Sequence, residues 1–218
     1  MRIELGLHVV MSGGGGFDLT DVLDFNAFLI DGGNREWVLF DAGAGRSPND
    51  ANAILAPDGI DPAAIRHLFL THCHADHSGG ARGLRDQLGL AVYAGRVTTP
   101  MVVAGDEAAI SLEPARRAGV YPHDYRYRAC PVDHVLGDDA ATTIGRLKIR
   151  TIETPGHSAD HVSFLVERGG RRPLIAGDAL FHGGRAPCRT SRTAASPTSA
   201  QRCESLPPLS SMHSCPAT

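Results

Sequence analysis

The strongest constraint in this sequence is a dense group of ionisable side chains directly after an apolar segment. Residues 67–70, His-Leu-Phe-Leu, are typical of a buried strand, and the next seven residues, 71–77, read Thr-His-Cys-His-Ala-Asp-His. Four of these seven residues are potential metal ligands, namely His72, His74, Asp76 and His77. Such a density of ligands at a strand end is uncommon in an ordinary polar loop, so the segment predicts a metal site.

The spacing of these ligands adds detail. His72 and His74 are two residues apart, so their side chains point to the same side of an extended backbone. Asp76 and His77 follow where the chain turns into a predicted helix. Imidazole nitrogens and carboxylate oxygens are usual ligands of zinc, and their number in one short segment favours two metal sites over one. Cys73 should face away from the two histidines that flank it, and we interpret it as a packing residue.

Two later segments place further ligands at strand ends. His157 lies in Thr-Pro-Gly-His-Ser, after a strand predicted over 147–153. Asp178 lies in Ala-Gly-Asp, after a strand predicted over 174–176. Sites on sheet scaffolds usually lie in loops at strand ends. Each segment alone is weak evidence, but together with 71–77 they indicate one metal centre.

The rest of the pattern predicts strand hairpins with helices between them. The segment 31–34, Asp-Gly-Gly-Asn, is typical of a tight turn and predicts an antiparallel hairpin. This organisation favours two sheets flanked by helices over a simple doubly wound sheet. The predicted strands are 3–10, 26–30, 37–40, 67–70, 90–93, 147–153, 161–166 and 174–176. The predicted helices are 50–56, 79–88 and 98–118, and 119–135 is predicted to be a loop.

These motifs resemble those of the metallo-β-lactamase superfamily. The matching residues are the His-x-His-x-Asp-His run at 72–77, His157 in its Pro-Gly-His setting, and Asp178 in Gly-Asp-Ala-Leu-Phe. The hairpin over 26–45 also looks like the first strands of that family. The resemblance covers roughly residues 1–186. It implies an α/β fold, a four-layer αββα sandwich with a metal site at one edge.

The resemblance also implies roles for the ligands. His72, His74 and His157 would hold a first metal, Asp76 and His77 would help to hold a second, and Asp178 would bridge the two. We therefore expect two Zn²⁺ per chain, with iron or manganese as alternatives. Two metals sharing a water make hydroxide available near neutral pH. Asp76 is the expected catalytic residue, because it is placed to orient that nucleophile or relay its proton.

The C-terminal residues depart from the family. The superfamily normally has one more histidine ligand after Asp178, and the only histidine in 187–218 is His213. No predicted strand precedes His213, so it is a poor candidate for that ligand. The segment 187–218 is rich in Ser, Thr, Pro and Cys and lacks hydrophobic periodicity, which predicts an irregular or disordered tail after a domain over 1–186.

The abrupt change near residue 187 suggests a hypothesis about the gene. When residues 214–218 are reverse-translated with GC-rich codons, another reading frame contains Pro-Gly-His. We therefore hypothesise that a one- or two-base error or lesion near codon 187 changed the frame. The DNA sequence of that region tests this hypothesis, because it must contain a frame that encodes a strand and Pro-Gly-His.

Composition excludes several classes of protein. Lys plus Arg is 21 and Asp plus Glu is 24, a net charge of −3, which argues against a nucleic-acid partner. No apolar run is long enough to span a bilayer, and no secretory leader is recognisable, so no membrane partner is expected. The five cysteines suggest no disulfide framework. We expect a cytoplasmic protein with a small-molecule substrate, and the sequence favours no oligomeric state.

The expected function is therefore a zinc-dependent hydrolase of an ester, thioester or lactone. The motifs look most like hydroxyacylglutathione hydrolase (glyoxalase II), which cleaves thioesters. One alternative is an iron-dependent persulfide dioxygenase on the same fold, which uses fewer of these ligands. Another is an inactive, truncated relative that binds one metal or none.

Other residues near the motifs carry less specific interpretations. His161 follows His157 by four residues and is interpreted as a structural group. His182 is a candidate for the mouth of the site. The predicted loop over 119–135 contains Tyr121, Tyr125 and Tyr127. These tyrosines either line one side of the substrate site or pack within their loop.

Overall fold

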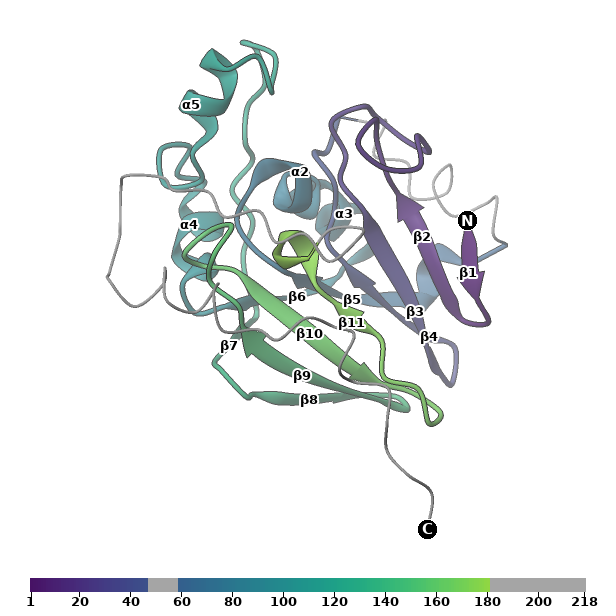
Figure 1. The fold of residues 1–218 in the computed structure, drawn as a ribbon. Helices are drawn as coiled ribbons and strands as arrows, with labels where there is room; N and C mark the ends of the chain where they lie inside the picture. Colours follow the sequence, from purple (N-terminus) through teal and green to yellow (C-terminus); the bar gives the residue numbers. More distant parts are fainter. Residues whose placement is uncertain (47–58, 181–218) are drawn as a thin grey trace, which may run out of the picture.

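The computed structural model describes residues 1–46 and 59–180 (Figure 1). Its strands are β1 (Arg2–Glu4), β2 (Leu7–Met11), β3 (Ala27–Gly33), β4 (Glu36–Phe40), β5 (Ile65–Leu70), β6 (Ala91–Gly95), β7 (His134–Leu136), β8 (Ala141–Ile144), β9 (Leu147–Glu153), β10 (Val162–Glu167) and β11 (Leu174–Ile175). Its helices are α2 (Ala75–Ser78), α3 (Ala81–Leu88), α4 (Thr98–Ala104) and α5 (Leu112–Arg117). Two short 3₁₀ helices are η2 (Pro62–Ala64) and η3 (Gly177–Ala179).

The strands form two sheets. The first has seven strands in the order β1-β2-β3-β4-β5-β6-β7, antiparallel from β1 to β4 and parallel from β4 to β7. The second has four antiparallel strands in the order β11-β10-β9-β8. The parallel pairs need crossover connections, and α2 with α3 and then α4 with α5 supply them after β5 and β6.

Alternation of side chains along the strands gives the molecule two apolar layers. In β4, Val38 and Phe40 belong to the core between the two sheets, whereas Leu39 belongs to the core beneath the helices. In β5, Phe69 faces the other sheet and its two neighbours face the helices. Phe69 meets Phe164 of β10 edge to face, with ring centroids 5.4 Å apart, which joins the sheets at the centre.

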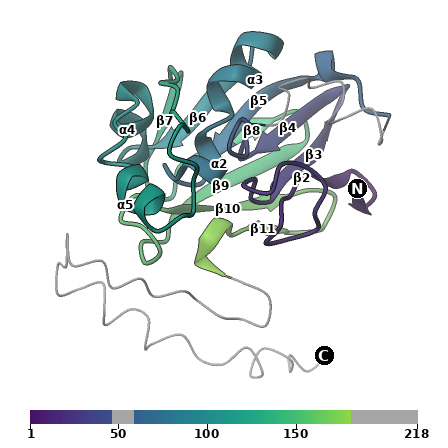
Figure 2. The ribbon, with the colours of Figure 1, turned by 90° about the horizontal axis from the view of Figure 1, so that it is seen from above.

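The helices of the described residues lie on one side of this sandwich. Figure 2 shows α3 and α4 on the side of the molecule away from β10 and β11. Two facing sheets with helices over the first are three layers of the expected α/β sandwich. Over 1–46 and 59–180 no helix covers the outer face of the second sheet. The expected domain boundary at 186 and the tail over 187–218 lie outside the described residues.

Most predicted elements correspond to observed ones, and the differences have physical causes. The single strand predicted over 3–10 is wrong, because Gly6 adopts a positive φ of 72° and turns the chain between β1 and β2. The strands β7 and β8 were not predicted, because each is short and half exposed. The helix predicted over 50–56 lies outside the described residues.

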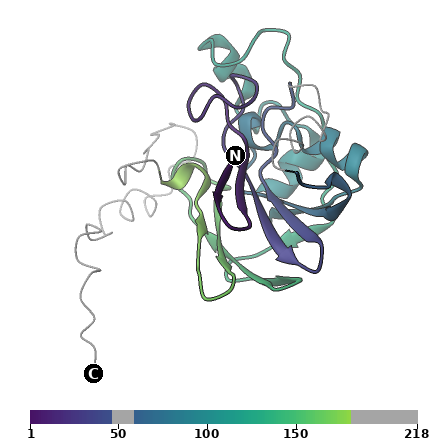
Figure 3. The same cartoon turned by 90° about the vertical axis from the view of Figure 1, so that its right-hand side faces the viewer.

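Loops that follow β5, β9 and β11 meet at one edge of the sandwich. The backbone N–H of Val162 in β10 donates to the carbonyl of Thr71, 2.8 Å away, and this contact links the two sheets there. Figure 3 shows the turns of the β3–β4 and β10–β11 hairpins at the end of the molecule away from η3. Within the described part of the chain, no helix has the length and apolar character needed to cross a membrane.

Candidate metal centre

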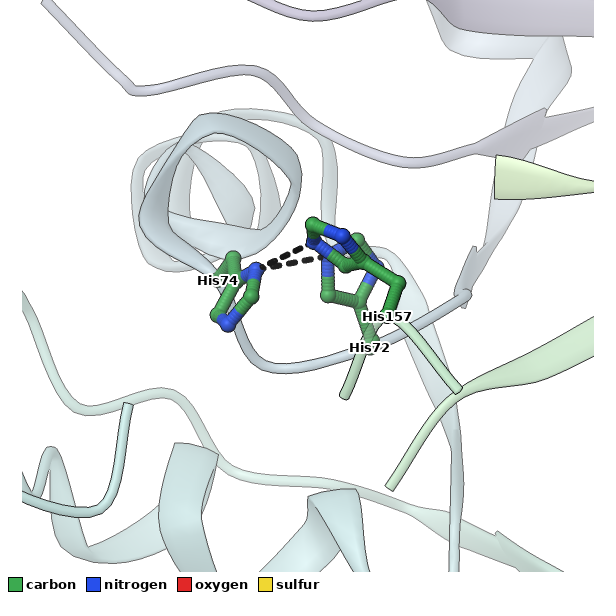
Figure 4. A group of neighbouring side chains, drawn as sticks. All are labelled: His72, His74 and His157. Atoms are coloured by element: carbon green, nitrogen blue, oxygen red, sulfur yellow. Dashed lines mark hydrogen bonds between the residues drawn. The ribbon is translucent and has the colours of Figure 1, made fainter. Parts of the chain in front are cut away.

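Three histidines from two loops form a first group of donor atoms. The Nδ1 atom of His74 lies 3.1 Å from Nε2 of His72 and 2.9 Å from Nε2 of His157 (Figure 4). His72 and His74 come from the segment after β5, and His157 comes from the loop after β9. The three ligand atoms all lie within 4.8 Å of one another. Imidazole nitrogens at this separation repel unless a proton or a cation lies among them.

A second group shares His72 with the first. It contains His72, His77 and Asp178, again with ligand atoms within 4.8 Å of one another. The Nε2 atom of His77 lies 3.2 Å from Oδ1 of Asp178, and the other carboxylate oxygen of Asp178 lies 3.2 Å from Nε2 of His157. Asp178 is therefore in contact with a histidine of each group, which is the position required of a bridging ligand.

Orphaned polar atoms show that these residues fit a metal. Nε2 of His77 and Oδ1 of Asp178 are buried and lie 3.2 Å apart, but this contact does not have hydrogen-bond geometry, and neither atom makes a hydrogen bond to another described residue. Leaving such atoms unsatisfied in a protein interior is costly. A cation with a preference for nitrogen and oxygen ligands satisfies both atoms at once, and zinc has this preference. We conclude that the donor set suits one or two divalent ions.

The electrostatics of the group favour neutral imidazoles. Burial and the neighbouring His77 and His74 lower the pKa of His72 well below its usual range. Burial and the neighbouring His157 lower the pKa of His74 to about 4. At neutral pH both rings therefore keep a lone pair for a metal. The hydroxyl of Thr71 donates to Asp41, so its oxygen accepts from Nδ1 of His72, 3.0 Å away, and leaves Nε2 of that ring as the donor atom.

Asp41 orients the second group, although it belongs to none of the sequence motifs. Its carboxylate accepts hydrogen bonds from the backbone N–H and the hydroxyl of Thr71, each 2.8 Å long, and from Nδ1 of His77 at 2.8 Å. This contact turns Nε2 of His77 toward Asp178. Burial opposes the charge on His77, but Asp41 and Asp178 raise its pKa well above the usual value. The signal in the sequence was an acidic residue directly after the apolar strand β4.

His161 holds the other side of the bridging residue. The backbone N–H of Asp178 donates to Nε2 of His161, 3.1 Å away, so the proton of this ring is on Nδ1. Nδ1 lies 2.9 Å from the hydroxyl oxygen of Thr154 and donates to it. Burial lowers the pKa of His161 to about 4, which keeps the ring neutral. His161 belongs to neither donor group, so its place in the structure matches the structural role expected from the sequence.

Gly177 allows the close approach of these elements. Its φ is +48°, and a Cβ atom at this position would lie 2.7 Å from Nε2 of His161 and 2.9 Å from the hydroxyl oxygen of Thr71. Any larger residue would push apart the two loops that carry the ligands.

Asp76 is the one predicted ligand that the structure leaves outside both donor groups. Its Oδ1 atom accepts a hydrogen bond of 2.8 Å from the hydroxyl of Tyr121, and the same hydroxyl oxygen accepts the backbone N–H of Asp76 at 3.0 Å. Burial and the charge of Asp76 raise the pKa of Tyr121, so the phenol stays protonated and remains a donor.

The tyrosines expected either to line the substrate or to pack within their loop are all buried. The hydroxyl of Tyr125 donates to the carbonyl of Ala44, 2.7 Å away, and that of Tyr127 lies 2.9 Å from the hydroxyl of Ser78. These contacts favour the interpretation that the tyrosines are packing residues rather than residues that line a substrate.

Cys73 is buried and lies in neither donor group, as expected for a packing residue. Its backbone N–H donates to a carboxylate oxygen of Asp160, 2.8 Å away. Like Asp41, Asp160 is a contact residue that no sequence motif predicted. His182 and His213 lie outside the described residues.

Several curated proteins are similar in sequence to this chain. A protein named "Probable metallo-hydrolase YqgX" from Bacillus subtilis is 29% identical over 157 residues, which are 72% of this chain and 66% of the relative. A hydroxyacylglutathione hydrolase from Glaesserella parasuis is 33% identical over 140 residues, 63% of this chain and 45% of the relative. The chain thus spans less than two thirds of the length of either relative.

Solved structures share the fold at low sequence identity. A metallo-beta-lactamase of Cronobacter sakazakii with an HARLDQ motif has a TM-score of 0.65 and 20% identity, over 80% of this chain and 62% of that chain. The metallo-beta-lactamase GOB-18 of Elizabethkingia meningoseptica has a TM-score of 0.64 and 20% identity, over 81% of this chain and 60% of that chain. The family model for the metallo-beta-lactamase superfamily matches residues 21–208. Because that range covers most of the sequence and contains every predicted ligand, the chain belongs to the metallo-beta-lactamase superfamily.

Proposed function

We propose that this protein is a zinc-dependent hydrolase of a thioester, ester or lactone, most like hydroxyacylglutathione hydrolase. The observation that carries the proposal is the pair of donor groups that share His72, with Asp178 in contact with a histidine of each. Two cations bound by donor groups that share a residue would be able to act on one carbonyl, as in two-metal hydrolases. The curated relatives are metallo-hydrolases, and those named hydroxyacylglutathione hydrolase favour a thioester substrate.

The proposed ligands follow the two groups. His72, His74 and His157 would hold the first ion, and His77 and Asp76 would hold the second. Asp178, which contacts a histidine of each group, would serve both ions. When bound, such ions supply Lewis acidity to a substrate carbonyl and lower the pKa of water.

The side chains of the protein supply position and proton handling. We expect Asp76 to orient the attacking water, because its carboxylate can accept a hydrogen bond from that water. Asp41 and His161 keep His77 and Asp178 at fixed angles, so that the site does not reorganise during the reaction. The proposed substrate is a small molecule. The expected cytoplasmic location stays a prediction.

Metal content and turnover of the purified chain test the proposal. We expect zinc by elemental analysis and hydrolysis of a hydroxyacylglutathione thioester, with esters and lactones as rival substrates. His157→Ala should reduce zinc content and turnover together, because it removes a donor from the first group. His123→Ala is the matched control, since His123 is exposed and belongs to neither group.

Other results would contradict the proposal. Iron in place of zinc, with oxygen uptake on a persulfide, would support the persulfide dioxygenase instead. Full zinc loading without turnover of any thioester, ester or lactone would support an inactive relative.

A further inference from the structure

The contact between Tyr121 and Asp76 has no role in the chemistry described so far. The phenol of Tyr121 contacts both the side chain and the backbone of Asp76. It donates to Oδ1 at 2.8 Å and accepts a hydrogen bond from the backbone N–H at 3.0 Å. The two residues are 45 positions apart in the sequence. Rotation of the Asp76 side chain away from this position would break the bond to Oδ1 while the phenol stays in place.

Tyr121 is itself held in place. Its side chain is 7% exposed, and its ring stacks on that of Tyr125 at a centroid distance of 5.2 Å and an interplanar angle of 28°. Tyr125 is fixed in turn by its hydrogen bond to the carbonyl of Ala44. The ring of Tyr121 therefore cannot follow Asp76 if the carboxylate turns.

We propose that Tyr121 is a positioning residue that holds Oδ1 of Asp76 and thereby favours Oδ2 as the donor to the second metal ion. This inference rests on the proposed function, since it assumes that Asp76 is a ligand of that ion. A carboxylate oxygen that accepts a phenol proton has one lone pair fewer for a cation, so the oxygen without that bond is the preferred metal donor. Groups that orient a metal ligand in this way typically change metal affinity about 10- to 100-fold when they are removed.

The opposing explanation is purely structural. The N–H of Asp76 lies in the first turn of α2, and Tyr121 satisfies it where the helix cannot. Under that explanation, loss of the hydroxyl would lower the stability of the fold without acting on one metal ion in particular.

Stepwise zinc binding to the metal-free protein separates the two explanations. Competition with a chromophoric chelator gives an affinity for each ion. Tyr121→Phe should weaken the second step about tenfold and leave the first step unchanged. Tyr93→Phe is the matched control, because Tyr93 is also 7% exposed and its hydroxyl contacts Nδ1 of His67, away from the site. It should change neither step.

A double-mutant cycle removes any dependence on the stability of one variant. In an Asp76→Asn background there is no carboxylate to hold, so Tyr121→Phe should then change the second step less than threefold. An equal loss in both backgrounds, an equal loss in both binding steps, or no loss at all would overturn the inference. So would a wild-type protein that binds only one zinc ion.

These outcomes are distinct from failure of the proposed function. A wild-type protein that binds two zinc ions, and loses the second in Tyr121→Phe, supports the inference even if it hydrolyses no substrate. If the protein hydrolyses thioesters but binds the second zinc ion equally well with and without the Tyr121 hydroxyl, the proposed function stands and the role of Tyr121 is rejected.

Discussion

Single residues outside the two donor groups determine the orientation of the metal-ligand side chains. Asp41 is 2% exposed and accepts three hydrogen bonds, one of them from His77, which is a member of the second group. His161 and Gly177 act in the same way on Asp178. The chemistry of the site therefore depends on buried partners as much as on the ligands themselves.

The first prediction at this scale concerns Asp41→Asn. The amide cannot accept the Nδ1 proton of His77 and both bonds from Thr71 at full strength, so His77 loses its fixed orientation. We expect the second zinc ion to bind about 10- to 100-fold more weakly, with the first ion unaffected. Stepwise zinc competition measures this change, and an unchanged second step would show that Asp41 does not orient His77.

The second prediction compares two glycines with the same backbone constraint. Gly177 and Gly169 have φ values of +48° and +52°, but a Cβ atom would meet close neighbours only at Gly177. Gly169→Ala should cost about 1 to 2 kcal/mol from backbone strain alone. Gly177→Ala should cost at least about 1 kcal/mol more, because the new methyl group lies against His161 and Thr71. Urea unfolding of the metal-free variants tests this order, and equal losses would contradict it.

At the scale of elements, one side chain connects three segments of the chain. The Oδ2 atom of Asp160, just before β10, accepts the backbone N–H of Cys73 at 2.8 Å and the hydroxyl of Thr98 at 3.1 Å. The first contact reaches the segment that carries His72 and His74, and the second reaches the start of α4. The β9–β10 loop, which carries His157, is thereby held against the other half of the first donor group.

Asp160→Ala tests this connection. It leaves the buried N–H of Cys73 without a partner, which costs about 1 to 3 kcal/mol. Thr98→Val is the control, since it removes the hydroxyl contacts to Oδ2 and to the backbone carbonyl of Asp160 and leaves the bond to Cys73. We expect Asp160→Ala to lower both the free energy of unfolding and the affinity for the first zinc ion, and Thr98→Val to affect the affinity much less. Equal first-ion affinity in both variants would exclude a role for Asp160 in the site.

At the scale of the whole molecule, packing of several histidines in one interior makes stability depend on pH. Burial, with the charges of neighbouring histidines, lowers the pKa values of His74 and His161 to about 4 each, and burial also lowers that of His72. In the unfolded chain all three titrate near the ordinary value of about 6.5. Between pH 6.5 and the lower pKa values of the folded protein, the unfolded state binds more protons than the folded state. The free energy of unfolding therefore falls as the pH falls through this range.

The fourth prediction follows from this sign. The free energy of unfolding of the metal-free protein should fall as the pH decreases from 6.5, and the loss should reach about 3 kcal/mol for each of His74 and His161 by pH 4. His77 acts in the opposite direction: its raised pKa adds stability below pH 6.5 that is lost only as the pH rises through the raised value. Urea unfolding at pH 7, 6 and 5 measures the effect, and a constant free energy would contradict it.

The sequence by itself predicted the family and the α/β class, and it supplied six candidate ligands. These follow from local features: ligands spaced along 72–77, and single ligands directly after predicted strands. The structure brings five of the six predicted ligands into two groups and leaves Asp76 beside Tyr121. It also divides the strand expected over 3–10 at Gly6, where a positive φ overrides an apolar pattern.

Only the tertiary structure decided which partners hold the ligands. Asp41 lies 36 positions before His77, Tyr121 lies 45 positions after Asp76, and Asp160 lies 87 positions after Cys73. None of these pairs has a signal in local periodicity, because each depends on how two sheets and a helical segment pack together. A local pattern can predict which residues could bind a metal, whereas the orientation of each ligand is set by buried hydrogen bonds that form only when distant segments meet.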